Sequence, residues 1–193
     1  MKTKTKANRN GAIQPEPLAT RVALHPFLAG MNHKQLTLLT DCAIAARFKT
    51  GETILQEGEF ANRCYLIETG RVVVESVDCF GEPLLIEAIG AGDLLGWSWM
   101  FPPYVWQFTA RAIEPATAIF FYGTILREYC EKDHSLGYEL LKRISAVMVK
   151  RLQAAHKQIL SVCSRGTSLE PLIGEGQGSL CRPVDSKSAV EWD

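Results

Sequence analysis

The stretch FKTGETILQEGEFANRCYLIETGRVVV, residues 48–74, places short apolar runs between glycines, and this pattern decides the fold. Runs of the same kind continue on both sides, over residues 42–122. Short apolar or alternating runs with turn residues at this spacing are typical of antiparallel rolls and barrels. The predicted strands are 43–48, 53–55, 64–67, 72–75, 84–88, 108–112 and 116–121. The glycines at the expected turns are Gly51, Gly58, Gly70, Gly81, Gly90, Gly92 and Gly96.

Helical periodicity flanks this β segment on both sides. Asn32 is a typical capping residue before Leu36 and Leu39, so we expect a short amphipathic helix that ends near Asp41. A second short helix is expected around residues 125–129. Ser135 is then expected to cap a much longer helix.

The long helix carries an apolar stripe whose members are separated by threes and fours, as in a coiled coil. The stripe consists of Leu141, Ile144, Met148, Leu152, Ala155, Ile159 and Val162. A helix of this length cannot bury its whole stripe on a small roll. We therefore predict a homodimer, with the interface at Leu141, Ile144, Met148, Leu152, Ala155 and Ile159. The alternative is a helix that lies entirely on its own domain.

The two ends of the chain lack this periodicity. Residues 1–20 are polar and basic, and residues 164–193 are rich in glycine, proline and serine, so both are expected to be disordered tails. Residues 21–134 are expected to form the β-roll and residues 135–163 the dimerisation helix. The 193 residues thus predict one compact domain with extensions.

Composition and charge narrow the class of protein. The 21 basic and 21 acidic side chains cancel, which gives no general reason to expect a nucleic acid or a membrane as partner. No apolar window is long enough to span a bilayer, and the N-terminus has no apolar leader. We therefore expect a soluble protein. The six cysteines form no CxxC pair, so we expect a cytoplasmic location with free thiols. The alternative for the cysteines is an iron–sulfur or zinc site.

Several motifs together resemble the cyclic-nucleotide-binding domains of the catabolite activator and FNR family of bacterial regulators. They are Phe48-Lys49-Thr50-Gly51, Ile54, Gly58, Tyr65-Leu66-Ile67-Glu68-Thr69-Gly70-Arg71-Val72 and Gly92-Asp93-Leu94-Leu95-Gly96. The resemblance covers residues 26–162. It implies a mainly β fold: a double-stranded β-helix, or jelly roll, with flanking helices and a long C-terminal dimerisation helix. In this fold the ligand lies between the roll and the long helix.

The resemblance also implies where a cyclic nucleotide would be held. Family members place an acidic residue after the glycine that corresponds to Gly96, to bind the ribose, and an arginine followed by Ser or Thr before the next strand, to neutralise the phosphate. A buried phosphate needs such a fork-shaped cation together with backbone donors. In this chain the acidic position is Trp97, the arginine position is Trp106 and the Ser/Thr position is Gln107. Both charged contacts are missing, and Arg111 is the one nearby cation considered as a substitute.

Aromatic side chains replace those charges. Trp97, Trp99 and Trp106 lie within one short segment together with Phe101, Tyr104 and Phe108. Three interpretations of these side chains are open. They fill the former pocket, they shape it for a flatter or more apolar ligand, or they form an exposed patch for a protein partner. The candidate pocket residues are Gly96, Trp97, Ser98, Trp99, Trp106, Gln107, Phe108 and Arg111.

We therefore expect a non-enzymatic regulatory or sensor module that acts through protein contacts or through a small ligand other than cyclic AMP. The four histidines show no metal-binding spacing, and no catalytic motif is present, so no catalytic residue, metal or cofactor is expected.

The alternatives for a bound group are a cyclic nucleotide and, less favoured, haem, which some relatives sense. Family regulators continue into a helix-turn-helix domain, and residues 165–193 do not resemble one, so direct sequence-specific DNA binding is not expected. The alternative function is a cyclic-nucleotide-binding transcription regulator whose DNA contacts come from elsewhere.

Overall fold

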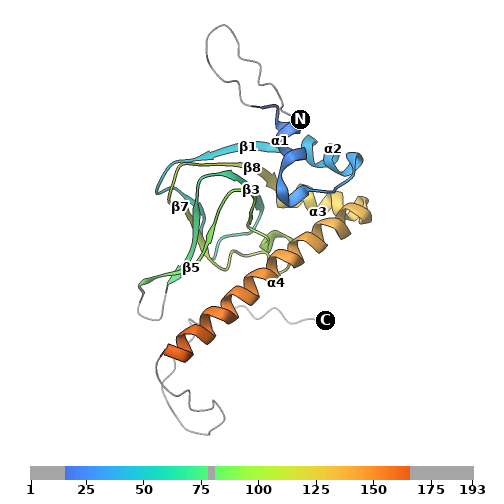
Figure 1. Cartoon of the computed structure of the whole chain (residues 1–193). Helices are drawn as coiled ribbons and strands as arrows, with labels where there is room; N and C mark the ends of the chain where they lie inside the picture. The colour runs from blue at the N-terminus through green and yellow to red at the C-terminus, as the bar shows by residue number, and fades with distance from the viewer. Residues whose placement is uncertain (1–15, 78–80, 166–193) are drawn as a thin grey trace, which may run out of the picture.

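Two four-stranded antiparallel sheets form a β-roll in the computed structural model, which describes residues 16–77 and 81–165 (Figure 1). The strand orders are β1-β8-β3-β6 in one sheet and β2-β7-β4-β5 in the other. The strands are β1 (Ile44–Phe48), β2 (Thr53–Leu55), β3 (Arg63–Thr69), β4 (Val72–Val77), β5 (Pro83–Ile89), β6 (Leu94–Leu95), β7 (Thr109–Ala112) and β8 (Ala116–Tyr122). This arrangement confirms the predicted jelly-roll class and all seven predicted strands; β6, which has two residues, was not predicted.

Helices pack beside the roll, and the longest one crosses it along one side (Figure 1). The helical segments are α1 (Leu18–Leu24), η1 (Pro26–Leu28), α2 (His33–Asp41), η2 (Ser98–Met100), α3 (Gly123–Lys132) and α4 (His134–Arg165). The start of α1 lies inside the segment 1–20 that was expected to be a tail, because Val22 and its neighbours pack on the core. Residues 1–15 and 166–193 lie outside the described residues, as do Cys79 and Cys181 and the side chain of Cys163, three of the six expected free thiols. None of the described helices is long and apolar enough to cross a membrane.

Two buried clusters lie on opposite faces of β3. Tyr65 and Ile67 point into the roll, where they pack with residues of both sheets. Cys64 and Leu66 point to the other face, where α2, α3 and the first half of α4 cover the sheet. Because successive side chains of a strand alternate between faces, a strand that is covered on both sides is apolar throughout. This explains the unbroken apolar run that the sequence shows here.

The first half of α4 belongs to this core. Leu136, Leu140 and Ile144 are buried, and Ile144 is only 1% exposed. Ile144 was predicted at the dimer interface, and that assignment is wrong, because its own chain already covers the side chain. The distal half is different, since Leu152 is 56% exposed and Ile159 is 59% exposed. The roll is therefore too small to cover all of α4, as the sequence indicated.

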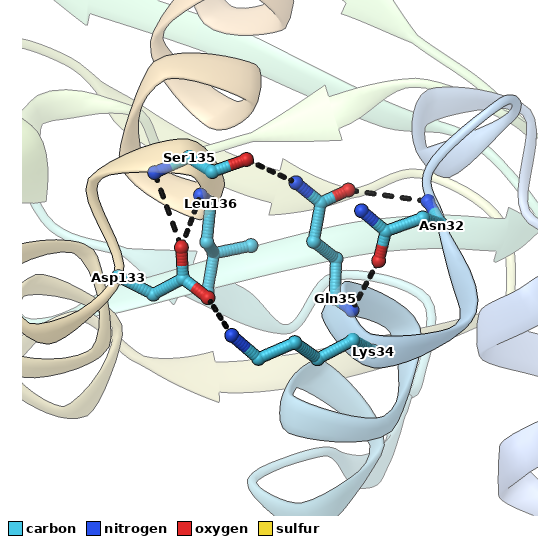
Figure 2. A network of polar contacts seen from close by, with 6 residues as sticks. All are labelled: Asn32, Lys34, Gln35, Asp133, Ser135 and Leu136. Atoms are coloured by element: carbon cyan, nitrogen blue, oxygen red, sulfur yellow. Dashed lines mark hydrogen bonds and ion pairs between the residues drawn. The ribbon is translucent and has the colours of Figure 1, made fainter.

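A polar network fixes the beginning of α4 against α2 (Figure 2). Asp133 Oδ1 accepts hydrogen bonds from the backbone N–H groups of Ser135 and Leu136, at 3.1 and 3.3 Å. Asp133 therefore caps α4, and the prediction that Ser135 would do so is wrong. Lys34 Nζ reaches Asp133 Oδ2 at 2.8 Å, and Gln35 Nε2 donates to Ser135 Oγ at 3.3 Å. Asn32 caps α2 in a capping box with Gln35, as predicted.

Candidate ligand pocket

A cavity of about 660 Å³ lies between the roll and α4. Strands β2, β4, β5, β6 and β7 contribute small and aliphatic side chains to it, and α4 closes the facing side. Trp97, Trp106 and Phe108 come from the segment between β6 and β7 and supply the aromatic part of the wall. A mostly apolar cavity of this size with a few polar groups is typical of small-molecule sites.

The backbone at Gly96 sets the position of the aromatic wall. Gly96 has φ +78°, a left-handed conformation that glycine adopts without strain. A Cβ atom here would meet the Trp106 ring at 2.9 Å and the Arg63 carbonyl oxygen at 3.2 Å. Glycine therefore allows the indole of Trp106 to lie directly against the backbone, where it is 5% exposed. Trp97, the next residue, is half-buried and packs edge-on against Phe101.

The structure brings most of the predicted pocket residues together. Gly96, Trp97, Ser98, Trp106, Gln107 and Phe108 all line the cavity. The aromatic side chains line this space and leave it open, which favours a pocket shaped for a ligand over the alternative of a filled pocket. Of the side chains predicted for a dimer interface, Met148, Leu152 and Ala155 also line the cavity, from α4.

Trp99 was predicted in the pocket and lies elsewhere. Its side chain is 1% exposed and belongs to the cluster between the sheet and the helices. A Cβ at Gly123, the first residue of α3, would meet Trp99 Cβ at 2.6 Å, so glycine is needed there for close packing. The Arg127 guanidinium donates a hydrogen bond to the Trp99 carbonyl oxygen and covers the Tyr104 ring. Trp97, which precedes η2, packs at the edge of this same cluster and also lines the cavity, whereas Trp99 within η2 does not reach the cavity.

Arg111 is also outside the cavity. It lies on β7, and its guanidinium binds Glu75 of the neighbouring β4, with Nη2 at 2.5 Å and Nε at 3.0 Å from Oε1. Adjacent residues on a strand face opposite sides, so Ala110 lines the cavity while Arg111 faces outward. Arg111 therefore cannot replace the missing phosphate ligand.

Two charged side chains that were not predicted do reach the cavity: Arg151 of α4 and Glu87 of β5. Arg151 Nε lies 3.0 Å from Glu87 Oε2, and Nη2 donates to the Leu94 carbonyl oxygen at 2.7 Å. Burial lowers the pKa of Arg151, and burial raises the pKa of Glu87 against the opposing effect of the Arg151 charge. The family resemblance implied a cation in the loop from Gly96 onward, whereas Arg151 comes from α4. Helical spacing puts Arg151 beside Met148 of the apolar stripe, three residues earlier, but it does not indicate that this turn of the helix faces the cavity.

Among the described residues, no group of three or more His, Cys, Asp and Glu side chains could hold a metal ion. Cys42, Cys64 and Cys130 are free thiols. Burial raises the pKa of Cys64 to about 12 and that of Cys42 and Cys130 to about 11, so these groups are not activated nucleophiles.

Residues 45–133 match the family model described as cyclic nucleotide-binding domain. This segment contains the β-roll and α3, and it contributes every part of the cavity except α4. The comparison with curated proteins finds no match.

Solved structures share the fold. A protein from Geobacter metallireducens GS-15, named as a cyclic nucleotide-binding protein, is 25% identical with a TM-score of 0.63 over 69% of this chain and 97% of its own. A cyclic nucleotide-binding domain from Methylobacillus flagellatus KT is 19% identical with a TM-score of 0.67 over 77% of this chain and 85% of its own. The catabolite activator protein of Thermus thermophilus is 17% identical with a TM-score of 0.58 over 72% of this chain and 63% of its own.

Proposed function

We propose that this chain, which contains a domain of the cyclic-nucleotide-binding type, is a non-enzymatic regulatory module that senses a small apolar ligand and works as a homodimer. The similarity to the family model and to the solved structures supports a regulatory role of the catabolite activator and FNR type. One observation carries the choice of ligand: the cavity between the roll and α4 is open, and aromatic side chains line it.

The two tryptophans argue against a cyclic nucleotide in the usual orientation. The family resemblance places the ribose-binding acid at Trp97 and the phosphate-binding arginine at Trp106, and both side chains line the cavity here. In the usual orientation a cyclic phosphate would lie against two indoles in place of its charged ligand contacts, and Arg151 alone would have to compensate for its lost hydration. A flat apolar ligand would instead gain contact area with the same rings.

Helix α4 connects this cavity to the surface on which a second copy would pack. Met148 and Leu152 line the cavity, and Ile159, about two turns beyond Leu152 in the same stripe, is exposed. A ligand that contacts the first two residues can shift the position of α4, and the distal stripe moves with it. This arrangement supports a response that passes from the ligand to the dimer.

Binding of 2-naphthamide, a flat neutral molecule, tests this function. We expect the wild-type protein to bind it in a calorimetric titration, with a change in tryptophan fluorescence. Ala154 lines the cavity from α4, so Ala154→Trp should occupy the space and abolish binding. Ala146 is also an exposed alanine of α4 but lies outside the cavity lining, so it provides the matched control, and Ala146→Trp should bind like the wild type. Absence of binding to the wild type, or equal binding to Ala154→Trp, would contradict the proposal.

The match to the cyclic nucleotide-binding domain model favours a second candidate, a regulator that does bind a cyclic nucleotide. Its DNA contacts would come from a segment or partner outside the described residues. Arg111 faces away from the cavity, so Arg151 would have to bind the phosphate. This candidate therefore predicts that Arg151→Met abolishes the binding of cyclic AMP.

A further inference from the structure

We infer that the ligand of this cavity is an apolar carboxylic acid whose carboxylate binds Arg151 in place of Glu87. The inference deepens the proposed function and rests on it, because it assigns a chemical class to the ligand of the same cavity.

The cavity contains one anchored cation. Glu87 and Arg151 are the only charged side chains that line it within the described part of the chain. The Arg151 side chain is 20% exposed, and its Nη2 is tied to the Leu94 carbonyl oxygen at 2.7 Å. A backbone carbonyl on a sheet strand cannot move away, so the guanidinium remains in the cavity wall whatever else binds there.

The guanidinium retains capacity to bind a carboxylate. Its two contacts use Nε and Nη2, which leaves Nη1 as a further donor. Arginine has five N–H groups in a planar fork and prefers a bidentate carboxylate. Glu87 offers a single oxygen to Nε, at 3.0 Å. The present ion pair is therefore incomplete, and an incoming carboxylate can form more hydrogen bonds than Glu87 does.

Glu87 is the partner that can leave. Its side chain is 35% exposed, against 20% for Arg151, and it lies on β5, at the end of its sheet. Burial disfavours its charged form, as the raised pKa shows, so moving it into water recovers hydration. Glu87 also demonstrates that a carboxylate fits at this guanidinium. The protein itself thus holds a carboxylate in the position that the ligand would take.

The rest of the wall determines the body of the ligand. Trp97, Trp106 and Phe108 provide aromatic surface, and Leu55, Val74 and Met148 provide aliphatic surface. A cationic ligand would gain from the indole faces, but it would lie in the same cavity as the anchored Arg151. A molecule with one carboxylate and an apolar body matches both parts of the wall.

The test compares 2-naphthoate with 2-naphthamide, which has the same ring system without the charge, by calorimetry on the full chain. We expect wild-type protein to bind 2-naphthoate roughly tenfold or more tightly than 2-naphthamide, as for a hydrogen bond to a charged group. Arg151→Met keeps the length of the side chain and removes the charge, and it should bring the two affinities together. Glu87→Gln should increase the preference for 2-naphthoate over 2-naphthamide, because it removes the competing carboxylate.

The double variant Arg151→Met with Glu87→Gln controls for an unpaired charge left in the wall. It should fold, as measured by its thermal midpoint, and bind both probes equally. Equal affinity of both probes for the wild type, or a preference for 2-naphthoate that survives Arg151→Met, would overturn this inference and leave the proposed function standing. Failure of the wild type to bind either probe would overturn both. A stronger affinity for 2-naphthylmethylammonium than for 2-naphthoate would show that the cavity selects cations.

Discussion

At the scale of single residues, the site differs from the one that the family resemblance implies in where the charge is placed. Tryptophans occupy the two loop positions at which the family resemblance implies charged ligand contacts, and the cavity's cation comes from α4, as Arg151. The loop substitutions could be predicted from the sequence because the glycines fix the register of the motif. Arg151 and Glu87 could not, because only the packing of α4 on β5 brings them together.

A comparison of two glycines tests the backbone requirement at the pocket. Both Gly58 and Gly96 have positive φ, but a Cβ at Gly58 meets nothing within 4 Å while one at Gly96 meets the Trp106 ring at 2.9 Å. We expect Gly58→Ala to lower the free energy of unfolding by about 1–2 kcal/mol, the cost of the left-handed conformation. Gly96→Ala should cost roughly 1–3 kcal/mol more, because it also displaces the indole. Urea unfolding measures both, and equal losses would show that Trp106 does not restrict this position.

His25 gives the protein a pH dependence. It is 4% exposed, its Nδ1 accepts from the Phe27 N–H at 3.3 Å, and its Nε2 donates to the Ile67 carbonyl oxygen at 3.0 Å, so the ring is neutral. Burial lowers its pKa from the usual 6.5, against the hydrogen bond to Ile67 and the charges of Glu68 and Asp93. The unfolded chain therefore takes up a proton at a higher pH than the folded one. Stability should fall as the pH decreases below about 6.5, until the pH passes the lowered pKa.

The variant His25→Gln retains a donor for the Ile67 carbonyl oxygen and has no proton to take up in this range. The difference in unfolding free energy between the wild type and this variant, measured from pH 7.5 downward, should shrink as the pH falls. A constant difference would contradict the assignment of this slope to His25.

At the scale of secondary-structure elements, α4 has three roles along its length. Its first turns complete the core, with Ile144 buried; its middle closes the cavity; and its distal part is exposed. The apolar stripe predicted the helix, and it predicted that the helix is longer than the roll can cover, because the three-four spacing can be read from the sequence of the helix alone. It did not reveal which turns the roll covers, and Ile144 was assigned to the wrong surface for that reason. The cap at Asp133 was missed because Asp133 and Ser135 are both good capping residues and lie close together.

The homodimer prediction can be tested in the exposed part of α4. Ile159 is 59% exposed, and Ile159→Glu should place a charge in the interface between two copies and produce monomers. Gln153 is exposed and lies about a third of a turn from the stripe, so Gln153→Glu adds the same charge outside it. Light scattering should give a dimer mass for the wild type and Gln153→Glu and a monomer mass for Ile159→Glu. An Ile159→Glu protein that is still dimeric would show that the stripe is not the interface.

At the scale of the whole molecule, the fold and the ligand chemistry follow from different parts of the sequence. Local patterns specify the roll: glycines between short apolar runs predict every strand of the two sheets except the two-residue β6. The cavity depends on long-range packing, since β2, β5, the loop after β6 and α4 each contribute to its wall. The chemistry of the cavity wall is therefore set by residues other than the glycines and apolar runs that specify the roll.

Titration of cyclic AMP in the presence of 2-naphthamide tests the proposed ligand class most directly. We expect 2-naphthamide to bind, and we expect cyclic AMP at millimolar concentration to give no heat of binding and to leave the 2-naphthamide affinity unchanged. Micromolar binding of cyclic AMP that displaces 2-naphthamide and is lost in Arg151→Met would contradict this proposal. Such a result would show that the aromatic cavity still holds a cyclic nucleotide, with Arg151 as its phosphate ligand.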